Sequence, residues 1–128
     1  MKTFLTTAAL LTLAAPAFAA GDADKGKKAF RQCKACHMIA SADETIVRGG
    51  RVGPNLYGVI GRTAGSVEDY NYSDALASAG ADGLVWDEQN LAEYSKDPSG
   101  FLGGRSKMTF KMRKGSEDVA AYLATFSD

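Results

Sequence analysis

The sequence has few of the residues that usually build metal centres and catalytic sites. Its 128 residues include two cysteines and one histidine, Cys33, Cys36 and His37, all within five consecutive positions. A structural zinc site needs four ligands, and His37 is badly placed to complete a tetrahedron with the adjacent Cys36. A redox dithiol usually accompanies a βαβ pattern, and no alternating strand pattern of useful length is present. The cysteine–histidine cluster therefore needs another explanation.

An excess of charge of one sign is also absent. The chain contains 15 lysines and arginines against 15 aspartates and glutamates. This balance gives no general attraction to nucleic acid or to an anionic membrane surface. We therefore expect no nucleic-acid partner, and any electrostatic targeting must come from the arrangement of the charges.

The sequence shows no apolar run long enough to span a membrane. Lys2 precedes an apolar run over residues 4–15, which Pro16 interrupts well short of the roughly 20 residues that a spanning helix needs. A small-x-small motif ending at Ala19 predicts cleavage of a secretory signal after Ala19 or Ala20. We predict a periplasmic protein without a membrane anchor.

Removal of residues 1–20 leaves a predicted single domain over residues 21–128, which we expect to be a monomer. In an oxidising compartment a disulfide is the default state of two cysteines. A bridge between Cys33 and Cys36 would close a very short loop, so it would constrain the unfolded chain little. A structural disulfide is a poor explanation of this pair.

Predicted helices are short and are separated by long irregular segments. Asp22 or Asp24 is suited to cap a first helix that runs into the cysteines. Three more helices are expected over residues 73–80, 87–97 and 116–126, capped by Ser73, Asp87 and Ser116, with Gly80 ending the first of these three. Residues 99–115 show little periodicity and are predicted to form an extended loop.

These patterns predict an all-α fold of four to five short helices with long loops. Such loops are uncommon in a compact domain unless they serve a function. They would be explained if something other than side chains filled the middle of the molecule.

The spacing of Cys33, Cys36 and His37 is typical of covalent haem attachment. Each thiol adds to a haem vinyl group, and the following histidine is carried beneath the iron. Export, the all-α pattern and the unfilled middle agree with this interpretation. The sequence therefore predicts one haem c per chain.

The sixth ligand of the iron decides between electron transfer and ligand chemistry, because a second strong ligand closes the iron to small molecules. No second histidine is present, which leaves methionine. Met1 leaves with the signal and Met38 adjoins the proximal histidine. Met108 and Met112 remain as candidates, and their spacing does not choose between them. A labile sixth ligand would instead indicate a haem enzyme or a gas sensor.

The chain resembles class I c-type cytochromes, and most closely the bacterial cytochromes c2, which are similar to mitochondrial cytochrome c. The resemblance covers residues 21–128. It depends on "CKACH", "GPNLYGVIGRTAG", "YNYSDA", the spacing of Trp86 and Tyr94, "KDP", "KMTF" and "EDVAAYL". It implies the cytochrome c fold wrapped around one haem.

The resemblance also implies roles for individual residues. Met108, and not Met112, would be the axial ligand opposite His37, and the carbonyl of Pro54 would accept the ring N–H of His37. Tyr94 would form a hydrogen bond near the methionine sulfur. The haem propionates would meet Tyr72, Trp86 and Arg62. Gly26 and Phe30 would pack across Val119 and Tyr122 of the last helix.

Two basic runs flank the predicted haem ligands. The first contains Lys25, Lys27, Lys28, Arg31 and Lys34, and the second contains Arg105, Lys107, Lys111, Arg113 and Lys114. A basic face around the cofactor edge would steer a near-neutral protein onto acidic partners. We therefore expect a one-electron carrier that is not an enzyme. The resemblance implies a cytochrome bc1-type donor and a photosynthetic reaction centre or terminal oxidase as acceptor, docked through residues such as Lys34, Lys107 and Lys111.

Overall fold

The structure is a computed structural model that describes residues 8–10 and 21–128. The predicted signal segment, residues 1–20, lies almost entirely outside these ranges. Within the described residues no helix is long and apolar enough to cross a membrane.

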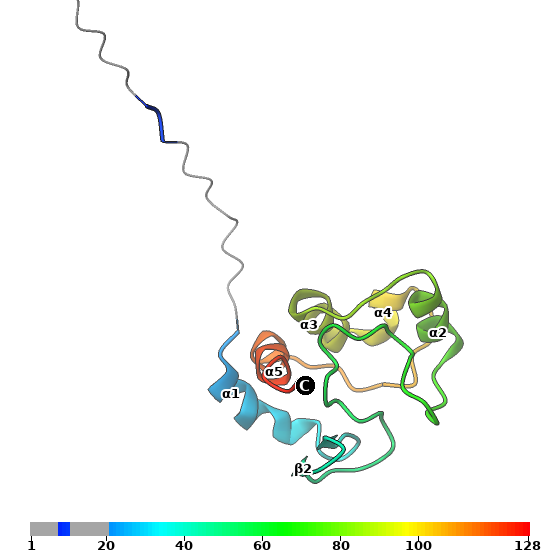
Figure 1. Ribbon diagram of the computed structural model, residues 1–128. Helices are drawn as coiled ribbons and strands as arrows, with labels where there is room; N and C mark the ends of the chain where they lie inside the picture. The colour runs from blue at the N-terminus through cyan, green and yellow to red at the C-terminus, as the bar shows by residue number, and fades with distance from the viewer. Residues whose placement is uncertain (1–7, 11–20) are drawn as a thin grey trace, which may run out of the picture.

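The chain from residue 21 onward is mostly helical, as predicted (Figure 1). A two-stranded antiparallel hairpin, which the sequence did not indicate, joins β1 to β2. In chain order the elements are α1 (Ala23–Ala29), the 3₁₀ helix η1 (Phe30–Gln32), β1 (Ile39–Ala40), β2 (Thr45–Val47), α2 (Asp74–Ala81), α3 (Glu88–Lys96), α4 (Pro98–Leu102) and α5 (Ser116–Leu123).

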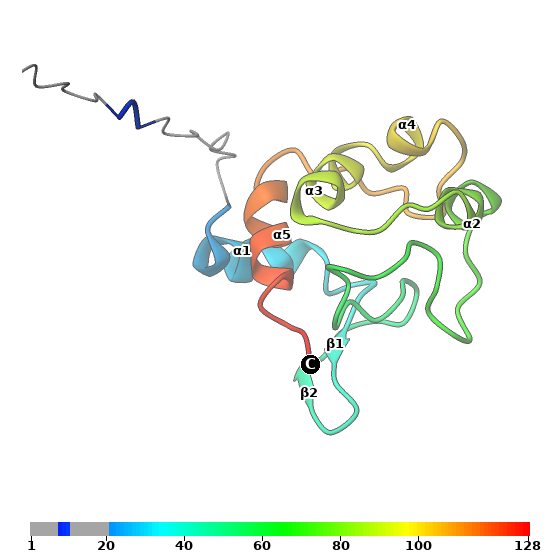
Figure 2. The same cartoon turned by 45° about the horizontal axis from the view of Figure 1, so that its top comes forward.

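The first and last helices pack closely against each other (Figure 2). The side chain of Asp22 caps α1 by accepting hydrogen bonds from the backbone N–H groups of residues 24 and 25. At Gly26 a Cβ atom would lie 1.9 Å from the carbonyl oxygen of Asp118, so only glycine allows this approach. One turn on, the buried ring of Phe30 meets Tyr122 edge-to-face at a centroid distance of 5.8 Å. The expected contact between the terminal helices is confirmed.

Three predicted helix termini are wrong. Helix α5 ends at Leu123 and not at residue 126. Helix α2 continues to Ala81, and Gly80 lies inside it against the carbonyl oxygen of Ala64, so this glycine serves close packing and does not end the helix. Helix α5 has Gly115 at its N-cap position, with φ of 82° and no side-chain cap. Ser116 is the first residue of that helix, and its hydroxyl donates to Glu117.

The segment predicted as an extended loop begins with a helix. The side chain of Asp97 accepts the N–H of Gly100, Pro98 takes the first helical position, and Gly103 ends α4 in the left-handed conformation with φ of 64°. A single turn with these end signals is too short to show helical periodicity. Beyond Gly103 the chain is irregular up to Gly115, as predicted.

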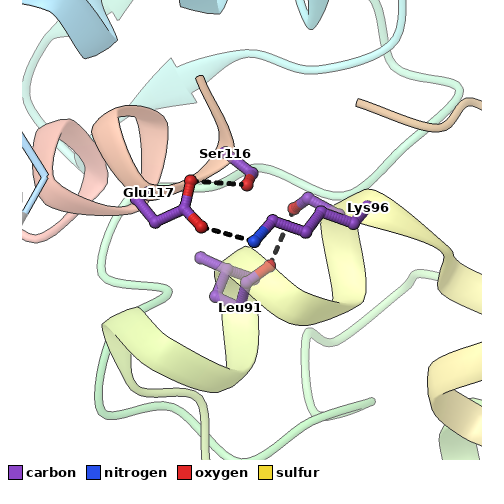
Figure 3. Close-up of polar contacts among 5 residues, drawn as sticks. Leu91, Lys96, Ser116 and Glu117 are labelled. Atoms are coloured by element: carbon purple, nitrogen blue, oxygen red, sulfur yellow. Dashed lines mark hydrogen bonds and ion pairs between the residues drawn. The ribbon is translucent and has the colours of Figure 1, made fainter. Parts of the chain in front are cut away.

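The C-terminal end of α3 is joined to the start of α5 (Figure 3). Lys96 forms an ion pair with Glu117, and Ser116 donates to the same carboxylate. Both charged side chains are about half exposed (50% and 53%), so the pair itself contributes at most about 1 kcal/mol. Nearby, the N–H of Met112 donates to the carbonyl of Ser95, which brings the irregular segment back onto α3.

Candidate haem site

A cavity of about 340 Å³ lies at the centre of the fold. Its walls come from the turn after η1, from residues 52–56, from α3 and α5, and from the irregular segment 106–112. The cavity brings together both cysteines, the histidine and two methionines, namely Cys33, Cys36, His37, Met108 and Met112. The long loops therefore enclose a mostly apolar chamber.

A tight turn presents the cysteines and the histidine to this cavity. Following η1, the N–H groups of Cys36 and His37 both donate to the carbonyl of Cys33, at 3.2 and 2.9 Å. The two thiols are free, with Cys33 half-buried and Cys36 exposed. Burial, and to a smaller extent the neighbouring Cys36, together raise the pKa of Cys33 to about 11. The Cys33 thiol is therefore protonated at neutral pH in the absence of haem.

The imidazole of His37 is oriented for metal binding. Its Nδ1–H donates to the carbonyl oxygen of Pro54 at 2.8 Å, which leaves Nε2 with a free lone pair. Burial lowers the pKa of His37, despite the opposing effect of the Pro54 hydrogen bond. The neutral imidazole, which is the form that ligates iron, is thus favoured.

Three glycines, which no sequence pattern connected with the haem site, position this histidine. At Gly53 a Cβ atom would lie 2.3 Å from Cε1 of the His37 ring, so the loop reaches the imidazole face only because residue 53 has no side chain. At Gly49 and Gly50 a Cβ atom would overlap the carbonyl oxygens of His37 and Ala35. In the sequence this segment is recognisable only as rich in glycine. The atoms that these glycines approach belong to residues 35 and 37, so the sequence alone does not reveal the contact.

On the other side of the cavity, a chain of hydrogen bonds supports Met108. The buried hydroxyl of Ser106 is 2.9 Å from the Tyr94 hydroxyl and accepts the N–H of Met108 at 3.1 Å. The N–H of Ser106 donates in turn to Ser99 on α4 at 3.0 Å. Burial raises the pKa of Tyr94, so its phenol stays protonated and can donate. Ser106 was not predicted, because a serine in an irregular segment carries no distinguishing signal.

We expect Ser106→Ala to cost more stability than Tyr94→Phe in denaturant unfolding of the haem-loaded protein. The alanine leaves both the Tyr94 hydroxyl and the Met108 N–H without this partner, for a loss of about 1–3 kcal/mol. The phenylalanine removes one hydroxyl while Ser106 still accepts from Met108, for a loss of about 1 kcal/mol. Equal losses would show that the Ser106–Met108 bond contributes nothing.

The three residues expected at the propionates lie in different surroundings. Tyr72 and Trp86 line the cavity, and the Tyr72 hydroxyl accepts the N–H of Val67 at 3.1 Å. Arg62 is not among the lining residues, and its guanidinium donates to the carbonyls of Asn55 and Tyr57 at 3.2 and 3.3 Å. A propionate contact of these three residues stays a prediction.

The two methionines differ in burial although both line the cavity. Met112 is 3% exposed and belongs to the hydrophobic core, whereas Met108 is half-buried. Met112 therefore serves as a packing residue of the core. The choice of Met108 as axial ligand stays a prediction.

The side chains around the cavity suit a haem attached by thioether bonds. Two thiols and a neutral imidazole project from one turn, and a thioether projects from the segment 106–112 into the same apolar chamber. A helical fold built around such a chamber defines a c-type cytochrome.

Comparisons with known proteins agree. Residues 23–127 match the family model of cytochrome c, so the chain belongs to the cytochrome c family. It is 52% identical over 134 residues to cytochrome c-551 of Roseobacter denitrificans, covering 98% of this chain and 96% of that protein. It is also 52% identical over 135 residues to cytochrome c2 of Rhodobacter capsulatus, covering 98% of both.

Solved structures give the same result. The structure of cytochrome c2 from Rhodobacter capsulatus superposes with a TM-score of 0.80 at 50% identity, covering 82% of this chain and 97% of that one. Ferric cytochrome c-550 from Paracoccus versutus gives a TM-score of 0.81 at 46% identity, covering 84% and 99%. The predicted fold is confirmed. The protein is an electron-carrier cytochrome, not an enzyme, and carries one haem c bound covalently through Cys33 and Cys36.

Proposed function

We propose that this protein is a soluble one-electron carrier in which His37 and Met108 would be the two protein ligands of the haem iron. The observation that carries the proposal is that one apolar cavity contains an imidazole with a free Nε2 and, on a separate segment, a methionine thioether. The haem supplies one-electron exchange between ferric and ferrous iron. Two protein ligands keep small molecules off the metal, and a soft thioether favours the reduced state.

The proposed location is the periplasm, with a signal sequence over residues 1–20 removed after Ala19 or Ala20 and one domain over residues 21–128. The contacts of Asp22 support this division. Asp22 caps α1, and its own N–H donates to the Asp118 carboxylate at 2.8 Å. Residues directly after the proposed cleavage site thus take part in the fold.

The proposed partners are a cytochrome bc1-type donor and a photosynthetic reaction centre or terminal oxidase as acceptor. Docking would use exposed lysines such as Lys34, Lys107 and Lys111. Lys107 lines the cavity and donates to the carbonyl of Asn71 at 2.7 Å. Lys111 is 3.4 Å from the carboxylate of Asp97, so this charge is partly neutralised. Lys34 stands between the two haem-binding cysteines and takes part in no ion pair among the described residues.

The proposal is tested by the salt dependence of the reaction between the reduced protein and bacterial membranes that contain a terminal oxidase. Attraction between exposed charges is largely screened beyond about 10 Å at 0.1 M ionic strength. We therefore expect the second-order rate to fall on the order of tenfold between low and high salt. A rate indifferent to salt would contradict the docking surface. Ready binding of carbon monoxide at neutral pH would contradict the carrier role, since it requires an open iron.

A further inference from the structure

A second hollow, of about 870 Å³, lies beside α1 and shares no lining residue with the haem cavity. One wall is the run from α1 through η1 to Lys34, and the other includes β2 and Arg48. In Figure 2 the hairpin lies below α1, on the side where the chain ends. We call this hollow the α1–β2 groove.

The α1–β2 groove is strongly basic in a chain whose charges balance overall. Five exposed cations line it, namely Lys27, Lys28, Arg31, Lys34 and Arg48, with one acid, Asp24. Lys27 lies on α1, Arg31 on η1 and Lys34 in the turn that follows, and Arg48 stands on the opposite wall. In the part of the chain that the structure describes, the ion pairs are Lys96–Glu117 and Lys111–Asp97, so none of the five cations takes part in an ion pair.

The groove also offers apolar surface. Ile46 on β2 is 37% exposed, and the half-buried Val47 and Phe126 line the hollow with it. A simple inorganic anion would pair with the cations but leave Ile46 in water. An occupant that satisfies both features carries several carboxylates and at least one apolar side chain along an extended backbone.

We propose that the α1–β2 groove binds an acidic, extended segment of a protein partner, with carboxylates on the α1 and Arg48 cations and an apolar side chain against Ile46. This inference rests on the proposed carrier function and assigns the segment to the redox partner. Because Lys34 lies between Cys33 and Cys36, the groove ends beside the haem attachment. A segment held there would raise the effective concentration of the partner at the haem edge without entering the haem cavity.

The test uses the haem-loaded protein and a fluorescein-labelled ten-residue peptide of glutamates with one central leucine. Its Kd is measured by fluorescence anisotropy at low salt for wild type and for the variant Lys27→Gln/Arg31→Gln/Arg48→Gln. The matched control is Arg105→Gln/Arg113→Gln/Lys114→Gln, which removes the same charges at exposed positions outside both hollows. We expect the Kd to rise about tenfold in the groove variant and less than about twofold in the control. Equal rises in the two variants would overturn the proposal, because net charge alone would then explain binding.

Two further measurements examine the chemistry of the occupant. Ile46→Ser should weaken the leucine peptide about threefold and leave a peptide with serine in place of leucine unchanged. Equal effects on both peptides would overturn the apolar contact. Vesicles of neutral lipid with added anionic lipid form the alternative probe. If the groove variant loses vesicle binding but keeps peptide binding, the groove is a membrane surface and the proposal fails.

If the groove does not bind the peptide, this result can be distinguished from a failure of the proposed carrier function. The substituted residues do not line the haem cavity, so the far-red charge-transfer band of the ferric protein and the midpoint potential should match wild type in every variant. The carrier role is decided separately, by whether the wild-type protein excludes carbon monoxide at neutral pH.

Discussion

Met108→Ala should remove the far-red charge-transfer band that marks methionine sulfur bound to ferric haem, and the reduced variant should bind carbon monoxide. The reason is that the iron loses its sixth ligand and becomes accessible. The midpoint potential should fall by on the order of 100 mV, because axial ligands tune haem potentials over about 0.8 V. Visible spectra of both oxidation states, carbon monoxide titration and potentiometry measure these changes.

Met112→Ala is the matched control, because both methionines line the cavity. We expect this variant to keep the far-red band and to exclude carbon monoxide. We expect its free energy of unfolding to fall by about 2–5 kcal/mol, since the Met112 side chain is 3% exposed and its removal leaves a void in the core. The reverse result, with the band lost in Met112→Ala and retained in Met108→Ala, would show that the ligand assignment is wrong.

Cys33→Ala/Cys36→Ala should abolish covalent haem attachment and, with it, most of the helical structure. An unfilled cavity of about 340 Å³ would cost about 8 kcal/mol at about 24 cal/mol per Å³. That is comparable with the whole stability of a small domain, about 5–15 kcal/mol. Haem staining after denaturing electrophoresis and far-UV circular dichroism measure the two losses.

Ala35→Ser, which changes an exposed residue between the two cysteines, is the control for this double variant. It should retain covalent haem and the helical spectrum. If the double variant lost haem but kept its helical spectrum, the helices would be shown to fold without the haem that the cavity is proposed to hold.

Structural features that depend only on residues close in sequence were predicted correctly. Asp22, Ser73 and Asp87 each cap a helix as expected, because an N-cap side chain bonds to backbone N–H groups two or three residues further on. The expectation for Gly80 failed because packing against another segment decided that position, and the expectation for Ser116 failed because Gly115 takes the N-cap position in the left-handed conformation. Gly80 is required where α2 meets Ala64, and the turn at Gly115 begins α5 without a side-chain cap.

The sequence by itself determined that the protein attaches haem, because the two thiols and the imidazole must come from adjacent positions whatever the rest of the chain does. Only the tertiary structure decided which distant groups surround them. Gly53 and the Pro54 carbonyl meet the face and the Nδ1 of His37, and Met112 is buried in the core while Ser106 supports Met108. The α1–β2 groove exists for the same reason, since it forms only where α1 and the hairpin come together. Contacts between distant segments depend on the path of the loops around the haem cavity, and no periodicity or spacing in the sequence records that path.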